Sequence, residues 1–169
     1  MIMPWTPALP KISALDKALK ILSASPVSEA ELRRKLYRAG YPDILIDQAL
    51  DECRRHNYIN DELLAADSAE YLIARGTGRR MVKVKLRRRG LDKELVDEVI
   101  ANTDPEEELE AARYALECKL RLLVREKDHR KKREKAFRFL VSRGYSSSII
   151  STLFSEINWK CQEEFSEDA

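Results

Sequence analysis

The chain has 169 residues, of which 44% are hydrophobic and 36% charged, so globular helical structure is expected but no single large core is implied. Its net charge is only +2, but residues 76–143 hold 20 Lys and Arg against 13 Asp and Glu, a surplus of 7 that offers a positive surface to an acidic partner. No run of about 18 apolar residues occurs and the first residues do not resemble an export signal, so we exclude a membrane span and expect a cytoplasmic protein.

The first predicted elements are an irregular arm and a helix. Residues 1–11 carry three prolines, which remove backbone donors and disfavour a helix. Apolar residues then recur from Leu15 to Leu22 at the i, i+3, i+4, i+7 spacing of one helical face. The sequence therefore predicts a helix over about residues 13–23.

Two further helices complete a first group of three. Ser28 and Glu31 form a capping box, in which the serine oxygen accepts an N–H group that the first helical turn leaves unpaired. This second helix is predicted to end at Gly40, because glycine adopts the left-handed conformation without a Cβ clash. Pro42 fits the opening turn of the third helix, whose buried face is expected to include Ile44.

Residues 57–61 connect the first group to a second. Asn57 is predicted to end the third helix in a left-handed conformation, and Tyr58 and Ile59 are expected to pack inward. Asn60 or Asp61 can cap a fourth helix over about residues 62–75.

Glycines separate the remaining helices of the second group. The stretch Gly76-Thr77-Gly78 interrupts the pattern, and a basic helix follows until Gly90. Asp92 is predicted to cap the sixth helix.

A third group opens at Asp104-Pro105, where a capping residue, a proline and two glutamates mark a helix start. This helix is expected to continue to about residue 125. A basic helix follows over about residues 130–142, and a last helix over 147–157. Residues 158–169 form an acidic tail.

The three groups are copies of one pattern. Eight positions agree in chemical class three times, at constant offsets of 50 and then 54 residues. We therefore predict an all-α protein with three tandem three-helix, helix-turn-helix-like repeats, at 12–57, 58–103 and 104–157, forming an elongated, curved array. The matching sets are Leu32, Leu36, Gly40, Tyr41, Leu45, Ile46, Ala49 and Leu50, then Val82, Leu86, Gly90, Leu91, Leu95, Val96, Val99 and Ile100, then Ala136, Leu140, Gly144, Tyr145, Ile149, Ile150, Leu153 and Phe154.

The sequence offers no catalytic or ligand-binding motif. A phosphate loop and a nucleophile motif are both absent, and neither His56 nor His129 has a partner at metal-ligand spacing. The three cysteines lie far apart without a C-x-x-C pair, as expected for reduced, inert thiols. We predict no enzymatic activity, no catalytic residues, no metal and no cofactor.

Basic residues cluster on the second helix of each repeat. Like charges at i, i+4 destabilise a helix, and no acid between Arg79 and Arg89 relieves them, so a solvated face explains them less well than a binding face does. The candidate partner-binding residues are Arg34, Arg38, Arg79, Arg80, Lys83, Arg87, Arg130, Lys131, Lys135 and Arg138.

The repeat resembles the RecX family, bacterial regulators of the recombinase RecA. The resemblance covers about residues 12–157. It rests on the order and spacing of the repeat, together with Ser28-Glu-Ala-Glu-Leu-Arg-Arg-Lys-Leu36, Tyr58-Ile-Asn-Asp61 and Leu86-Arg-Arg-Arg-Gly-Leu91.

The resemblance implies a non-enzymatic modulator, mainly an inhibitor, that binds in the groove of the RecA–DNA filament. Such a protein would limit filament growth or persistence and lower ATPase, strand-exchange and coprotease activity. The expected partners are the RecA filament and, weakly and without sequence preference, single- or double-stranded DNA. We expect a monomer that binds no membrane.

Two other functions fit parts of the sequence. A helix-turn-helix transcription regulator would share the three-helix unit and its glycine turn, but the third helices carry acids such as Asp47 and Glu94 that DNA phosphates would repel. A protein adaptor without nucleic-acid contact is the other alternative.

Overall fold

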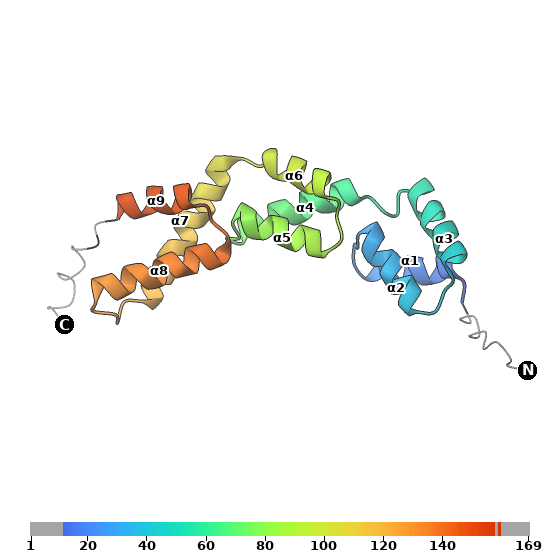
Figure 1. Ribbon diagram of the computed structural model, residues 1–169, viewed down its shortest axis with the longest axis horizontal. Coiled ribbons are helices and arrows are strands. Elements are labelled where there is room, and N and C mark those ends of the chain that lie inside the picture. The colour runs from blue at the N-terminus through green and yellow to red at the C-terminus, as the bar shows by residue number, and fades with distance from the viewer. Residues whose placement is uncertain (1–11, 158, 160–169) are drawn as a thin grey trace, which may run out of the picture. The chain divides into compact units, whose positions relative to one another are not determined.

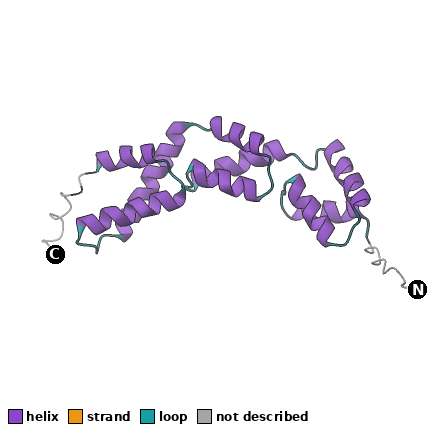
Figure 2. Cartoon of the chain, viewed as in Figure 1, coloured by secondary structure: helices purple, strands orange, loops and turns teal. Residues whose placement is uncertain are grey.

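A computed structural model of the chain describes residues 12–157 and 159 (Figure 1). Within these residues the regular structure is helical throughout, as predicted (Figure 2). The predicted N-terminal arm and most of the acidic tail lie outside the described residues. The helices are α1 (Ala14–Ala24), α2 (Glu29–Arg38), α3 (Asp43–Arg55), α4 (Asp61–Ala74), α5 (Arg79–Arg88), α6 (Lys93–Ala101), α7 (Pro105–Leu122), α8 (His129–Arg143) and α9 (Ser147–Glu156).

The chain divides into two compact units. The first consists of residues 1–67 with 86–96, and the second of residues 68–85 with 97–169. Each unit thus contains one terminal three-helix group together with parts of helices α4, α5 and α6.

Polar caps set the helix starts at the residues that the sequence indicates. The Ser28 hydroxyl accepts the Glu31 N–H at 3.1 Å, and the Asn60 amide oxygen accepts the Leu63 N–H at 2.8 Å. Asp104 accepts the Glu106 N–H at 2.9 Å, with Pro105 as the first helical residue of α7. One detail differs: Pro42 stands just before α3 with extended backbone, because its ψ of 152° is not helical.

Left-handed residues end the second helices. Gly40, Gly90 and Gly144 have φ values of +88°, +87° and +88°. Asn57, which ends α3, is the one non-glycine residue with positive φ in the described part of the chain, at +54°. These conformations are costly for residues with a Cβ atom, and Asn is among the side chains that tolerate them best. The predicted helix ends are confirmed.

Burial repeats with the sequence pattern. In the first copy Leu32, Leu36 and Ile46 have no exposed surface, and their counterparts in the other copies are 2% exposed or less. Two expectations were wrong. Ile44 is 72% exposed, because it lies two residues before the buried Ile46 and so about 200° away around the helix. Tyr58 is 52% exposed and stacks on a histidine ring instead of packing inward.

A polar junction joins the start of α2 to the turn after α5, inside the first unit. The Ser28 hydroxyl donates to the Arg89 carbonyl, and the Arg89 guanidinium donates to the Pro26 carbonyl at 2.9 Å. The Glu29 N–H, at the start of α2, donates to the Asp61 carboxylate at 3.0 Å. The first turn of α2 is thereby capped by residues from the next repeat.

The second unit contains a similar junction. Its glycine and arginine positions follow the repeat offsets of 50 and 54 residues, whereas its acid, Glu108, stands 47 residues after the corresponding Asp61. The Gly78 N–H donates to the Arg143 carbonyl at 2.9 Å, and the Arg143 guanidinium donates to the Gly76 carbonyl at 3.4 Å. The Arg79 N–H, at the start of α5, donates to the Glu108 carboxylate at 2.8 Å. The repeat therefore extends from single helices to the contacts that join successive repeats.

Candidate partner-binding surface

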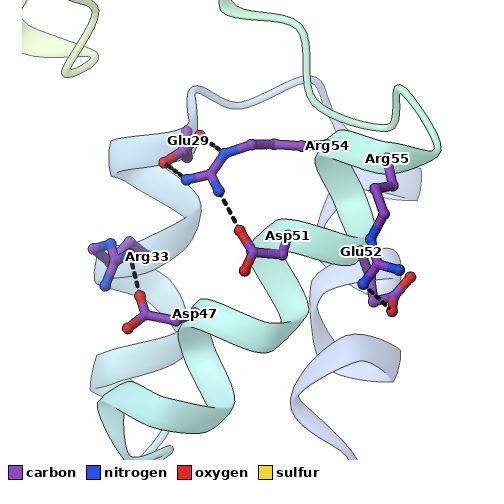
Figure 3. Close-up of polar contacts among 7 residues, drawn as sticks. All are labelled: Glu29, Arg33, Asp47, Asp51, Glu52, Arg54 and Arg55. Atoms are coloured by element: carbon purple, nitrogen blue, oxygen red, sulfur yellow. Dashed lines mark hydrogen bonds and ion pairs between the residues drawn. The ribbon is translucent and has the colours of Figure 1, made fainter.

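On the first repeat, the two predicted cations are accessible. Arg34 and Arg38 are exposed on α2 and make no ion pair within the described residues. Their neighbour Arg33 instead pairs with Asp47 of α3 (Figure 3). Lys35 pairs with an acid one turn earlier on α2, at 3.1 Å. The charge that α2 offers to a partner therefore comes from Arg34 and Arg38.

Acids of α2 and α3 pair with the arginines of α3 in the same unit. Arg54 of α3 donates from Nε to the Glu29 carboxylate at 2.7 Å and also pairs with Asp51 (Figure 3). Arg55 pairs with Glu52 one turn away. The bond from Arg54 holds the pKa of Glu29 below its ordinary value. Arginines near α3 are thus neutralised locally, whereas those on the outer face of α2 are not.

On α5 the predicted residues divide into two kinds. Arg79 belongs to the junction: its Nε lies 3.0 Å from Glu108, its guanidinium donates to the Thr103 carbonyl, and its side chain is only 25% exposed. Lys83 pairs with Asp97 of α6 at 2.7 Å. Arg80 is exposed. The inference that no opposite charge relieves this helix is therefore wrong, because α6 and α7 supply the acids.

Arg87 is exposed and makes one long hydrogen bond, of 3.4 Å, to the Leu91 carbonyl. Lys85 and Arg88 are exposed on the same helix and were not among the predicted residues. They lie outside the i, i+4 series of Arg79, Lys83 and Arg87 from which the candidates were chosen. Only a count of all basic residues in α5 could have identified them. With Arg80 they give α5 four accessible cations.

On α8, three of the four predicted cations have nearby acids. Lys135 pairs with Glu126, Arg138 with Glu134 at 2.8 Å, and Lys131 lies 3.8 Å from a carboxylate oxygen of the helix cap Asp128. The Lys135 ammonium lowers the pKa of Glu126, and the Lys131 backbone N–H lowers that of Asp128. Such exposed pairs are weak because solvent screens them, so a strong anionic partner can displace them.

Arg130 is exposed in the first turn of α8 and makes no ion pair within the described residues. Two further findings concern the part of the chain that is described. No three His, Cys, Asp or Glu side chains there gather in a group able to hold a metal ion. None of the helices described is both long and apolar enough to span a membrane.

Three-helix groups linked by similar polar junctions, with exposed cations on the second helix of each group, define an all-helical repeat protein with a candidate partner-binding surface. Comparison with known proteins makes this more specific. The family model "RecX, first three-helix domain" matches residues 14–53, and "RecX, third three-helix domain" matches residues 106–154.

Curated relatives agree over most of the chain. The regulatory protein RecX of Deinococcus radiodurans is 35% identical over 144 residues, which is 85% of this chain and 67% of that protein. The regulatory protein RecX of Syntrophotalea carbinolica is 33% identical, covering 87% of this chain and 97% of the relative. That of Vibrio campbellii is 32% identical, covering 86% and 92%.

Solved structures share the fold. The crystal structure of RecX from Lactobacillus salivarius matches with a TM-score of 0.73 at 20% identity, covering 85% of this chain and 93% of the other. A second RecX crystal structure matches with a TM-score of 0.74 at 23% identity, covering 84% and 70%. The chain belongs to the RecX family of regulatory proteins.

Proposed function

We propose that this protein is a non-enzymatic modulator, mainly an inhibitor, of RecA that works in the cytoplasm. It binds as a monomer in the groove of the RecA–DNA filament, limits filament growth or persistence, and lowers ATPase, strand-exchange and coprotease activity. Family membership supports the regulatory role. The observation that carries the binding mode is the set of accessible cations repeated on α2, α5 and α8.

The charge distribution supports an anionic partner of extended form. Arg34 and Arg38 on α2, Arg80 on α5 and Arg130 on α8 are all exposed, and all lie on the second helix of a repeat. A compact acidic ligand would need cations gathered in one pocket. Cations repeated along the chain instead suit a surface that is itself repetitive, such as a filament of identical subunits with DNA phosphates.

The helix-turn-helix alternative fits less well. A recognition helix must enter the major groove beside the phosphates. Asp43, Asp47 and Asp51 are exposed on α3, and Glu94 and Glu98 on α6, so both third helices present acids to such a groove. We therefore assign any DNA contact to the second helices, and expect it to be independent of base sequence.

The test replaces Arg34, Arg38, Arg80 and Arg130 by Gln. Arg79 and Lys83 are left intact, since Arg79 holds the junction and its replacement would destabilise the second unit. We expect the variant to keep the parent's helicity and unfolding midpoint but to inhibit RecA ATPase at least about tenfold less, because a close interfacial charge pair contributes about 1.5 kcal/mol or more. Inhibition is measured by titration into RecA–DNA filaments.

A matched control loses the same charge elsewhere, through Lys17→Gln, Lys20→Gln, Arg121→Gln and Arg125→Gln. The proposal requires this control to inhibit like the parent. Each phosphate contact removed should also lower the salt slope of filament binding by about 0.7–0.9. Reduced inhibition with an unchanged slope would place these arginines against RecA carboxylates. Equal inhibition by both variants and the parent would refute the assignment of the surface.

A further inference from the structure

The second unit has a groove of which the proposed function uses only one residue, Arg130. It lies between the first half of α8 and α9, has a volume of about 580 Å³ and opens to solvent. Its apolar lining comes from Phe137, which is 46% exposed, and from Ile150 and Phe154. Phe137 and Phe154 have ring centroids 6.2 Å apart. An exposed aromatic side chain beside a cavity is a feature of many binding sites.

The rim of the groove combines cations with small side chains. Arg130 and Arg133 rise from α8, and the Arg133 guanidinium lies 5.8 Å from the centre of the Phe154 ring. Ser147, Ser151 and Ser155, spaced four residues apart, form the α9 side. Serines leave room for a chain to lie along α9. The groove therefore suits an acidic segment with an aromatic anchor.

The chain itself supplies such a segment next to the groove. Residues 160–169 hold four acids, one lysine and Phe165, a net charge of −3. They follow Trp159, whose ring packs edge-on against Phe154 at 4.9 Å and donates from Nε1 to the Phe154 carbonyl at 3.2 Å. The segment is thus attached beside a residue of the groove wall, and ten residues can span at most about 33–36 Å, which is enough chain to reach along the groove.

We propose that residues 160–169 bind this groove, with Phe165 against Phe137 and the acids of the segment against Arg130 and Arg133. A nucleic-acid strand fits less well, since it is not attached beside the groove and would need a higher intrinsic affinity to occupy it.

The affinity needed is low. Groups joined by a short flexible connection have an effective concentration on the order of 1 mM. A dissociation constant near 100 µM for the separate peptide would thus keep the segment bound in about nine molecules of ten. The interaction does not depend on the proposed function, because it is measured without RecA or DNA.

The experiment uses a fluorescein-labelled peptide of residues 160–169 carrying Cys161→Ser. It is titrated by anisotropy with the protein that lacks these residues, after circular dichroism has shown unchanged helicity. We expect saturable binding, about tenfold weaker with the full chain because its own segment competes. Phe165→Ala in the peptide, or Arg130→Gln with Arg133→Gln in the protein, should weaken binding by at least about fivefold, and Arg121→Gln with Arg125→Gln should not.

Four outcomes would overturn the proposal. The first is no saturable peptide binding at millimolar protein, and the second is equal peptide affinity for the full and shortened chains. The third is a peptide affinity that does not change when Arg130 and Arg133 are replaced. The fourth is weak peptide binding together with tight binding of a labelled dT oligonucleotide that depends on the same two arginines. The last would make the groove a nucleic-acid site.

Discussion

Glu108 of α7 is a carboxylate almost fully withdrawn from water, with its side chain 5% exposed. It accepts the backbone N–H of Arg79 at 2.8 Å and lies 3.0 Å from that residue's Nε. One acid thus caps α5 and neutralises its first arginine. Burial of an unpaired charge is costly, so each partner requires the other.

Replacing Glu108 by Ala should therefore destabilise the protein by about 2–3 kcal/mol, less than the roughly 3–5 of a fully buried pair because Arg79 keeps some contact with water. Chemical denaturation followed by circular dichroism measures the loss. The control is Glu117→Ala on the exposed face of the same helix, which should change stability by no more than about 0.5 kcal/mol. Similar effects of the two changes would contradict the junction.

The charges of two acids near the first junction should have opposite effects on the stability of the fold. The hydrogen bond from Arg54 lowers the pKa of Glu29, so its charge stabilises the fold above the ordinary value of 4.5, and this stability is lost as the pH falls through the lowered pKa. Burial raises the pKa of Asp61, so its charge costs stability once the pH rises through that raised value.

Glu29→Gln should therefore be less stable than the parent at pH 7 and equal to it near pH 3. Asp61→Asn keeps an acceptor for the Glu29 N–H and should gain stability relative to the parent at pH 7 but not near pH 3. Urea denaturation at both values measures the differences. A deficit for Glu29→Gln that persists at low pH would mean that the lost interaction is not the ion pair.

At the scale of helices, the three glycine turns share a conformation but not a neighbourhood. Gly40, Gly90 and Gly144 have nearly the same positive φ. A Cβ atom at Gly40 would meet nothing within 4 Å, whereas one at Gly90 would lie 2.9 Å from the Cβ of Ala30. Gly90 thus serves both a helix end and the junction between repeats.

Alanine at the two positions separates these roles. Gly40→Ala should cost about 1–2 kcal/mol, the strain of a left-handed residue with a Cβ atom. Gly90→Ala should cost a further 1–3 kcal/mol or so, because the junction must shift to accept the methyl group. Thermal unfolding of both variants gives the difference. Equal losses of stability in the two variants would show that the contact between α2 and the turn at Gly90 is not tight.

At the scale of the whole molecule, the proposed function depends on which positive charges stay available to a partner. Exposed arginines remain on α2, on α5 and at the start of α8, whereas Arg79 and Lys83 are engaged with acids of the second unit. Inhibition of RecA should therefore depend on the exposed set. The elongated, curved array and the monomeric state remain predictions of the repeat, which small-angle scattering and sedimentation can measure.

Local chemistry was sufficient to predict the helices and their ends from the sequence. Apolar spacing, capping oxygens and glycine stops act within a few residues, so Ser28, Asn57, Gly90 and Asp104 could be assigned from the sequence, and three copies of one pattern defined the architecture. Which face of a helix is buried depends on what packs against it. The predictions that Ile44 and Tyr58 are buried were therefore wrong.

Only the tertiary structure decided which basic residues are available to a partner. Asp97 and Glu108 lie on other helices than the cations they neutralise, and pairing across helices leaves no periodicity in the sequence. An arginine in a junction and an arginine in solvent occupy the same kind of position on an amphipathic helix. Contacts between segments far apart in the chain distinguish the two, so Arg79 stabilises the fold while Arg80 beside it remains exposed.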